Sequence, residues 1–513
     1  MPLARLIAVV AALYLYVFPY YPRLQSANEL PRVYLVKAIV DDHTFAIDRG
    51  IQRFGPTSDL ARYGDHYYQN KAPGASLLAV PAYAAVKAVA GEPSLAVTMW
   101  LCRVITGVIP TLVLLALLWR FLERLVPDEA TRRLALVAYA LGSMAMPYSL
   151  MFYAHQLSAM CIASAWILAQ DFADRRRGLG ALVAAGLLAG AGPLVDYEAA
   201  FALVPIAAHV VWKLRAWPRR ELVRAIAIAI GAAAIPIALL LYYHAACFGS
   251  PFATGYTYAT SYARDHDHGL LGMTHPTSTA FVGITISPGK GLFALAPWLL
   301  LAIPGGVALW RRGERAPEVG TDGESGRLES RALVLVCAGV AAAFLYFNSS
   351  IGFWHAGWSV GPRYMVAMLP FLVPLVAAGL AEWRARWPLA GLACGLVLVG
   401  VAIYTLACAT LPTWPETLRD PLYEVTFRLL GDGAVAPSLG RALGLHGLVS
   451  IAPFVLGSFA LAIWAIVRAM GTRALAVAVA VAAVAILAFA AAPRSGPDAL
   501  AGYERTLHPA VAQ

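Results

Sequence analysis

The sequence predicts an all-α, polytopic integral membrane protein with about 13 transmembrane helices. Two observations predict this class. Of the 513 residues, 60% are hydrophobic and only 13% are charged, whereas an average soluble domain carries about 25% charged residues. Apolar runs of about 17 to 25 residues recur from end to end, which is long enough to cross a bilayer, and they lack the alternation of membrane β-strands.

The candidate spans are separated by short loops that are rich in arginine. They lie near residues 4–21, 96–119, 133–149, 155–170, 178–195, 197–212, 222–246, 291–310, 331–347, 364–381, 387–409, 448–467 and 474–492. Leu77–Val89 is a further apolar stretch. If it crossed, the basic loops around Arg120, Arg175 and Lys213 would move outside, against the positive-inside rule. We therefore expect it to lie at the membrane surface.

The same rule orients the chain. The amino terminus and the linker loop 311–331 are expected in the cytoplasm, and the carboxyl tail outside. The first span is expected to be retained, because no small-residue cleavage site follows it. We treat 1–513 as a single membrane domain in the cell membrane whose functional face is external or periplasmic. That face carries the long loops 22–95, 247–290, 348–363 and 410–447.

Charge and cysteine patterns exclude several functions. The net charge of +10 comes mostly from arginines in short loops, so no nucleic-acid partner is expected. The six cysteines are scattered without a CxxC spacing, so no zinc or redox site and no cofactor are expected. The segment Arg264–His268 alternates acids and histidines, but a solvated loop is the expected role, and no metal is predicted. Ser287–Gly291 lacks the full phosphate-loop pattern, and docking of a lipid phosphate or acceptor stays open.

The first external loop, 22–95, gathers polar residues and is too long to be a plain connector. A first helix is expected over Leu30–Val40, where apolar residues repeat at three and four positions, typical of a helix lying on a bilayer. A second starts at Pro73, a residue favoured in a first helical turn. Both are predicted to be juxtamembrane helices. Asp41 and Asp42 are expected at the solvated end of the first.

Three motifs resemble the membrane glycosyltransferases of the C superfamily, above all the bacterial aminoarabinose transferases and protein O-mannosyltransferases. In that family an acidic pair after the first span, an Arg and an aromatic precede a tyrosine-rich segment that ends in Lys-Pro-Pro. The matching pieces here are Asn28-Glu29, Arg32, Tyr34, the run Tyr67-Tyr68-Gln69-Asn70-Lys71-Ala72-Pro73-Gly74, and Gly361-Pro362-Arg363-Tyr364. The span count also agrees, although the sharp motifs occupy only about the first hundred residues.

The resemblance implies transfer of a sugar, with inversion, from a polyprenyl phosphate to a hydroxyl acceptor on a lipid, a glycan or a protein. The family uses the first acid of its acidic pair as the catalytic base. This chain has the amide Asn28 at that position, which leaves Glu29 as the candidate base. An acceptor hydroxyl must lose its proton as it attacks, and a carboxylate can take it. Lys71, Arg363 and Tyr68 would bind the donor phosphate. Each has a plainer interpretation as a helix cap, an interfacial anchor or a member of an aromatic belt.

Four further residues are candidates for substrate binding: Arg32, His155, Asp196 and His355. Asp196 and Glu198 are acids at the outer boundary of a span with no basic neighbour in sequence. Acids at a membrane boundary often serve function, but capping the next span would also explain them. Capping is an equal alternative for His155.

Two other functions stay open. A transporter or flippase of a lipid-linked sugar also needs many spans, but carriers place ionisable groups at the midplane, and Arg103 is the charge that stands out within a span. A non-catalytic scaffold is favoured by the missing aspartate at position 28. Buried charges that converge on a cavity at the outer face would favour an enzyme, whereas convergence at the midplane would favour a carrier.

Overall fold

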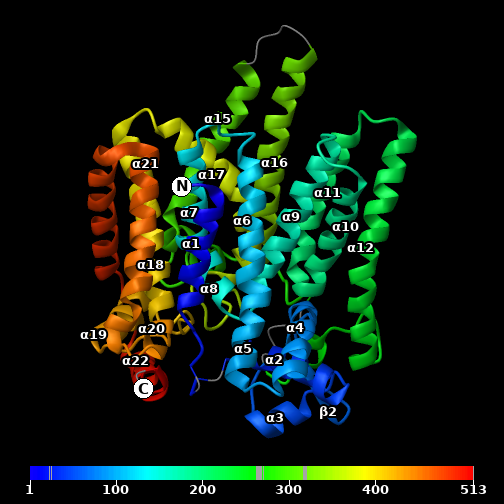
Figure 1. The fold of residues 1–513 in the computed structure, drawn as a ribbon, viewed down its shortest axis with the longest axis vertical. Helices are drawn as coiled ribbons and strands as arrows, with labels where there is room; N and C mark the ends of the chain where they lie inside the picture. The colour runs from blue at the N-terminus through cyan, green and yellow to red at the C-terminus, as the bar shows by residue number, and fades with distance from the viewer. Residues whose placement is uncertain (22, 25, 262–268, 270, 316–320, 512–513) are drawn as a thin grey trace.

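In the described part of the chain, the computed structural model is built from helices and a two-stranded hairpin (Figure 1). It describes residues 1–513 except 22, 25, 262–268, 270, 316–320 and 512–513. The amino-terminal elements are α1 (Leu3–Tyr16), α2 (Leu30–Lys37), η1 (Ala38–Asp42), α3 (Asp48–Phe54), β1 (Leu60–Tyr63), β2 (His66–Gln69), α4 (Gly74–Ala90), α5 (Leu95–Arg103), η2 (Val104–Val108) and α6 (Ile109–Leu122).

The middle of the chain continues as helices joined by short turns. They are α7 (Glu129–Leu141), α8 (Ala145–Leu150), α9 (His155–Ala173), α10 (Leu179–Val195), η3 (Tyr197–Ala199), α11 (Ala200–Leu214), α12 (Arg219–Phe248), η4 (Gly255–Tyr258), α13 (Ser278–Thr285), α14 (Leu292–Leu295), η6 (Pro297–Leu301) and α15 (Ala302–Arg315). The last elements are α16 (Thr321–Ser350), η7 (Arg363–Met368), α17 (Leu369–Trp383), α18 (Trp387–Ala409), η8 (Leu422–Phe427), α19 (Arg428–Gly431), α20 (Leu439–Ala442), α21 (Gly447–Ala490), α22 (Pro497–Gly502), η9 (Tyr503–Leu507) and α23 (His508–Val511).

The polytopic helical class expected from the sequence is confirmed. Within the described residues, 7 helices are long and apolar enough to cross a membrane, among them Leu95–Leu122 and Arg219–Phe248. Leu3–Tyr16 and Leu179–Val195 are shorter apolar helices. Each predicted span overlaps a helix or consecutive helices, although the first, 4–21, is helical only as far as Tyr16. The last two expected spans form α21, which is interrupted at Gly471, where φ is 83°.

One expected span, 133–149, is broken. α7 ends at Leu141 and α8 begins at Ala145. The carbonyl of Gly142, freed at the break, accepts a hydrogen bond of 2.6 Å from the indole Nε1 of Trp298. A buried carbonyl without a partner would be costly, so this side chain stabilises the break.

The segment 22–95, expected to be the first external loop, is more structured than expected. β1 and β2 form an antiparallel hairpin across Gly64, whose φ of 60° suits a tight turn. α4 starts at Gly74, one residue after the predicted start at Pro73, which is its N-cap. All eight residues of α2 are buried, so α2 lacks the exposed polar face of a helix lying on a bilayer. It packs against α4 and β2 instead.

Figure 1 places α2, α3, α4 and β2 together at one end of the long helices, with the carboxyl terminus at the same end. α15 ends and α16 begins at the opposite end, and α1 starts on that side as well. The main apolar core lies between these ends, where most residues of α7, α17 and α18 are buried. The polar site is therefore sought at the end that carries α2 and α4.

Candidate functional site

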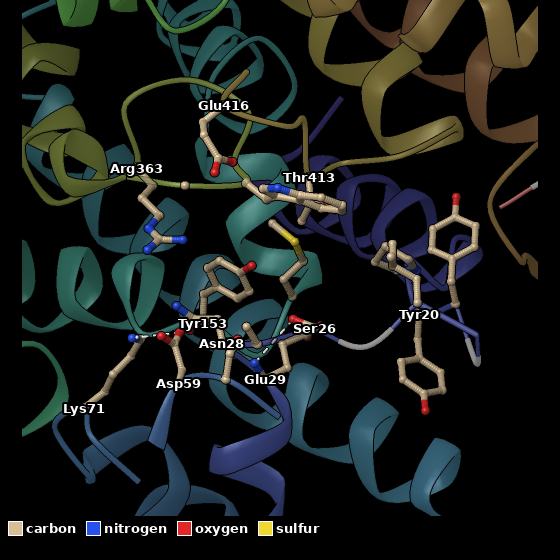
Figure 2. Close-up of a pocket in the computed structure, with 18 of the residues that line it drawn as sticks. Tyr20, Ser26, Asn28, Glu29, Asp59, Lys71, Tyr153, Arg363, Thr413 and Glu416 are labelled. Carbon is tan, nitrogen blue, oxygen red and sulfur yellow. Dashed lines mark hydrogen bonds and ion pairs between the residues drawn. The ribbon is translucent and has the colours of Figure 1, made fainter. Parts of the chain in front are cut away.

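A cavity of about 330 Å³ lies at the α2–α4 end of the molecule. Its wall combines the turn before α2, the loop before β1, the segment after β2, and the loops before η7 and η8. Figure 2 shows Arg363 and Glu416 on one side, with Lys71, Asp59 and Glu29 on the other. Segments far apart in the sequence thus bring two cations and three carboxylates to one space.

Glu29 lines this cavity, but its carboxylate is already bound. Arg103 donates to both of its oxygens, from Nε and Nη2, each at 2.8 Å. The backbone N–H of Phe152 donates to Oε1 at 2.6 Å. The side chains of Glu29 and Arg103 are both 4% exposed. A charge-assisted, bidentate pair of this kind is among the stronger hydrogen-bonded contacts in proteins, and it occupies both oxygens of the carboxylate.

Arg103 therefore has a clear partner. It is the charge that the sequence places within a span, and the bond to Glu29 fixes α5 to the turn before α2 across 74 positions of sequence. Breaking such a buried pair from one side costs several kcal/mol, because the remaining charge stays buried. Glu29 consequently has a structural role in addition to its place on the cavity wall.

The neighbours of Glu29 support the same turn. Arg32 donates to the amide oxygen of Asn28 at 3.3 Å and to the carbonyl of Ala72 at 3.4 Å. Its side chain is buried and is absent from the cavity wall in the described residues. Arg32, expected to bind substrate, here joins α2 to the segment that carries Lys71.

Lys71 and Arg363 approach the cavity from opposite sides. Lys71 Nζ lies 2.9 Å from the carboxylate of Asp59. Burial is the largest cause that lowers the pKa of Lys71; Asp59 opposes it, while Arg363 and Arg32 lower the pKa further. Two cations that repel each other across a cavity create a site that favours an anion.

Arg363 begins η7 and is buried against aromatic rings. Its guanidinium lies 5.7 Å from the ring centre of Tyr153 and 5.4 Å from that of Tyr364. Its buried Nε has no hydrogen-bond partner, and no acid of the described residues lies within ion-pair distance. An arginine that lacks a counter-ion in a buried wall is suited to bind a phosphate.

Lys290 supports the loop that leads to Arg363. Its ammonium donates to the carbonyls of Gly357 and Ser359 at 2.8 and 2.7 Å and to the Ser359 hydroxyl at 2.7 Å. These bonds occupy its three donors. The segment Ser287–Gly291, left open as a phosphate-docking site, therefore serves to hold a loop.

Of the eight predicted site residues, five lie outside the cavity wall among the described residues: Arg32, Tyr68, His155, Asp196 and His355. Tyr68 on β2 packs against Phe248 of α12, with ring centres 5.6 Å apart, because successive strand residues point to opposite faces. The His355 ring packs against Phe353, with ring centres 4.5 Å apart, and its Nδ1 accepts a hydrogen bond from the N–H of Gly357 within the same loop. His155 and Asp196 are adjacent, with Nδ1 and Oδ2 2.7 Å apart. The predicted cluster at 264–268 lies outside the described residues.

Sequence reasoning missed Asp59 and Glu416. Both acids line the cavity, and the buried Oε2 of Glu416 has no hydrogen-bond partner. Each stands in an irregular loop without a motif, so their only sequence signal was a place in a long external loop.

Fold and cavity together define a polytopic helical membrane protein with a charged cavity at one end of its helices. No known family model and no curated protein sequence matches the chain. Solved structures that resemble it include ArnT from Cupriavidus metallidurans bound to undecaprenyl phosphate, with 14% identity, a TM-score of 0.47, and coverage of 92% of this chain and 77% of that one.

Two other solved structures show a similar level of likeness. The arabinosyltransferase EmbB from Mycobacterium smegmatis gives 13% identity and a TM-score of 0.45, covering 95% of this chain and 40% of its own. The oligosaccharyltransferase AglB from Archaeoglobus fulgidus was solved in complex with an inhibitory peptide and a dolichol-phosphate. It gives 13% identity and a TM-score of 0.41, and the match covers 90% of this chain and 55% of AglB. Similarities at this level assign neither an activity nor a residue role to this chain.

Proposed function

We propose that this protein is a glycosyltransferase that transfers a sugar from a polyprenyl phosphate to a hydroxyl acceptor. The observation that carries the proposal is the cavity that unites Lys71 and Arg363 with the carboxylates of Glu29, Asp59 and Glu416. The sequence motifs around Asn28-Glu29, Lys71 and Arg363 support the same reaction. The transfer is proposed to occur with inversion on the non-cytoplasmic side.

The two cations fit the leaving group. As the glycosidic bond breaks, negative charge develops on the departing phosphate, and cations placed beforehand stabilise it without reorganisation. Arg363 has an unpartnered Nε for this task. Lys71 is held by Asp59, and an incoming phosphate would share or replace that partner. Arg363 and Lys71 would thus hold the phosphate from two sides.

The acceptor proton needs a base. Glu29 is the candidate from sequence, and it would have to loosen its bond to Arg103 before it could accept a proton. Glu416 is the candidate that the geometry adds, because its buried Oε2 is free of donors. A single base and one anion site suffice for direct displacement, whereas a covalent intermediate would need a nucleophile beside the sugar as well.

The position of the charges favours an enzyme over a carrier. Carriers bind their cargo near the bilayer midplane, whereas this cavity is built from loops and helix ends at one end of the molecule (Figures 1 and 2). Arg103, which could have marked a midplane site, is bound to Glu29 at the cavity wall.

Binding of undecaprenyl phosphate to the purified protein in detergent tests the anion site. We expect Lys71→Gln and Arg363→Gln each to weaken binding about 10- to 100-fold, because each removes a charge-assisted bond. Arg62→Gln is the control, since Arg62 is exposed in the same loop and absent from the cavity wall. Unchanged binding in both cavity variants would refute the phosphate site.

The reaction itself is tested in cells. Mass spectrometry of envelope glycans and lipids with and without the gene should show one sugar addition that depends on it. The Arg363→Gln chain, produced at the wild-type level, should fail to restore that addition. Identical glycan profiles in all strains would contradict the enzyme proposal.

A further inference from the structure

A second polar cluster lies beside the cavity, where α9, α10 and α11 meet. His155 is the first residue of α9, Asp196 directly follows α10, and Glu198 lies in η3 before α11. All three side chains are buried, with residue exposures of 5%, 7% and 4%. Short connections between these helices bring the three residues together.

Their ligand atoms are close enough to share one cation. His155 Nδ1 lies 2.7 Å from Asp196 Oδ2 and 3.6 Å from Glu198 Oε1. One possible ligand atom from each of the three residues lies within 4.8 Å of the other two. Donors bound to one transition-metal ion at about 2.0 to 2.2 Å are separated by similar distances. Only small side-chain shifts are needed for all three to bind one ion.

The charges of Arg32, Arg363 and Lys71 act on Asp196, but among the described residues none of them forms an ion pair with the cluster. The buried Oε1 of Glu198 has no hydrogen-bond partner. No lysine or arginine of the described residues lies within ion-pair distance of Asp196 or Glu198. Two neighbouring buried carboxylates repel each other unless a proton or a cation lies between them.

The cluster also has room beside it. A small cavity of about 20 Å³ is lined by Glu198, Tyr256 and Tyr364, which is space for about one water molecule. Tyr256 and Tyr364 also line the main cavity. A cation bound by three side chains would thus have a position for a water ligand on the side that faces the main cavity.

We propose that His155, Asp196 and Glu198 bind one divalent transition-metal cation, Zn²⁺ or Mn²⁺. One imidazole nitrogen with two carboxylates is a donor set that suits these ions. The bound cation would join the ends of α9, α10 and α11 behind Tyr364. This site is independent of the sugar-transfer proposal, and it differs from the sequence-based expectation of no metal.

Metal content of the full-length protein in detergent tests the site. After treatment with a chelator, the protein is incubated with Zn²⁺ or Mn²⁺, desalted, and analysed by mass spectrometry of the elements. We expect wild type to retain one equivalent of one of these ions, with a raised unfolding temperature, since a ligand that binds only the folded state stabilises it. Glu198→Gln and His155→Gln should weaken binding roughly tenfold or more.

Asp42→Asn provides the control, because Asp42 is a carboxylate of the same end whose partner is Arg49. Asp196→Asn is the second ligand variant if one of the others fails to fold, and size-exclusion profiles check folding. The proposal is overturned if wild type retains no more metal than Glu198→Gln. That result would leave a His–Asp hydrogen bond and a shared proton. Since metal is the readout, this outcome is separate from failure of sugar transfer.

Discussion

At the scale of single residues, the carboxylates of the cavity differ in what holds them. Glu29 accepts three hydrogen bonds, two of them from Arg103. Asp59 faces Lys71 at 2.9 Å, whereas the Oε2 of Glu416 is buried without a donor. We therefore expect substitution of Glu29 to lower stability, because Arg103 would lose its partner, and substitution of Glu416 to lower the transfer rate.

Glu416→Gln and Glu29→Gln form a matched pair. We expect Glu416→Gln to lower the transfer rate roughly 100-fold or more, as loss of a general base does, with normal donor binding and unfolding temperature. Glu29→Gln should lower the free energy of unfolding by about 3 to 5 kcal/mol, because Arg103 stays buried without its partner. Transfer rates and thermal unfolding in detergent measure both effects.

The double change Glu29→Gln with Arg103→Gln is the control, and it should recover part of the lost stability. If Glu29→Gln instead folds normally and loses the rate, while Glu416→Gln keeps it, Glu29 is the base.

The sequence predicted part of this site. Asn28-Glu29, Lys71 and Arg363 were found through motifs, and all of them line the cavity. The pairing of Glu29 with Arg103 could not be foreseen, since 74 positions separate the two and only the fold of the chain sets their distance. Tyr68 was selected with its neighbours in the same motif, but strand alternation turns it towards Phe248.

At the scale of elements, α15 and α17 show how closely helices approach in the apolar core. A Cβ built on Gly305 of α15 would lie 1.8 Å from the Leu375 carbonyl oxygen, and one on Gly379 of α17 would lie 2.3 Å from the Leu301 oxygen. Small residues that allow backbones to meet are typical of contacts between membrane helices.

Gly305→Ala should therefore destabilise the protein, by about 1 to 3 kcal/mol, because the backbone of α17 must shift. Gly306→Ala is the control from the same helix, since its Cβ would meet only a Val334 methyl at 3.9 Å. It should be neutral or slightly stabilising, as alanine favours a helix. Unfolding temperatures in detergent compare the two, and equal values would contradict this packing.

A polar network docks η1 onto α4. Asp41 accepts hydrogen bonds from Lys87 at 2.7 Å and Tyr83 at 2.9 Å. Burial by itself raises the pKa of Asp41, but these two bonds and the charge of Lys37 outweigh it, so the pKa lies below its usual value. The network stabilises the folded state when Asp41 is ionised.

Its contribution should be complete above the usual aspartate pKa of about 3.9. It should be lost as the pH falls through the lower pKa of the folded state. The rate of proteolytic cleavage within residues 22–95, measured from pH 6 to pH 3, should therefore rise only towards the acid end of this range. In Asp41→Asn the loop should be cleaved faster already at pH 6, and the acid-dependent rise should be smaller. Identical profiles for wild type and variant would contradict this role of Asp41.

Helices were predictable where long apolar runs define them, and irregular elements were not. Each expected span contains helix, whereas the break between α7 and α8 depends on Trp298 reaching Gly142 from far along the chain. The hairpin of β1 and β2 had a local signal, the Gly64-Asp65 turn between short β-prone runs, but its strands have four residues each. Strands so short give little periodicity.

At the scale of the whole molecule, the cavity gathers charge at one end of an apolar body. Figure 1 places α2 and α4 at that end, opposite the end of α15. Loops and helix ends there supply Glu29, Lys71, Arg363 and Glu416 to a single space. The segment 22–95 and the loop before η7 must therefore face the same compartment.

Labelling of single cysteines in intact cells tests this sidedness. The six native cysteines are all buried, so background with a maleimide that cannot cross membranes should be low. New cysteines are placed at exposed positions, Arg62→Cys in the first loop, Gly352→Cys before η7, and Arg311→Cys at the end of α15. A side chain at Gly352 meets no atom within 4 Å, so the change is tolerated sterically.

Positions 62 and 352 should react from outside in intact cells. Position 311 should react only after permeabilisation, because its basic loop is expected in the cytoplasm. Labelling all three in permeabilised cells shows that each site is reactive. Reaction of 62 and 352 from opposite sides would mean that Lys71 and Arg363 never share one aqueous space, and neither the cavity nor a phosphate held between them could exist.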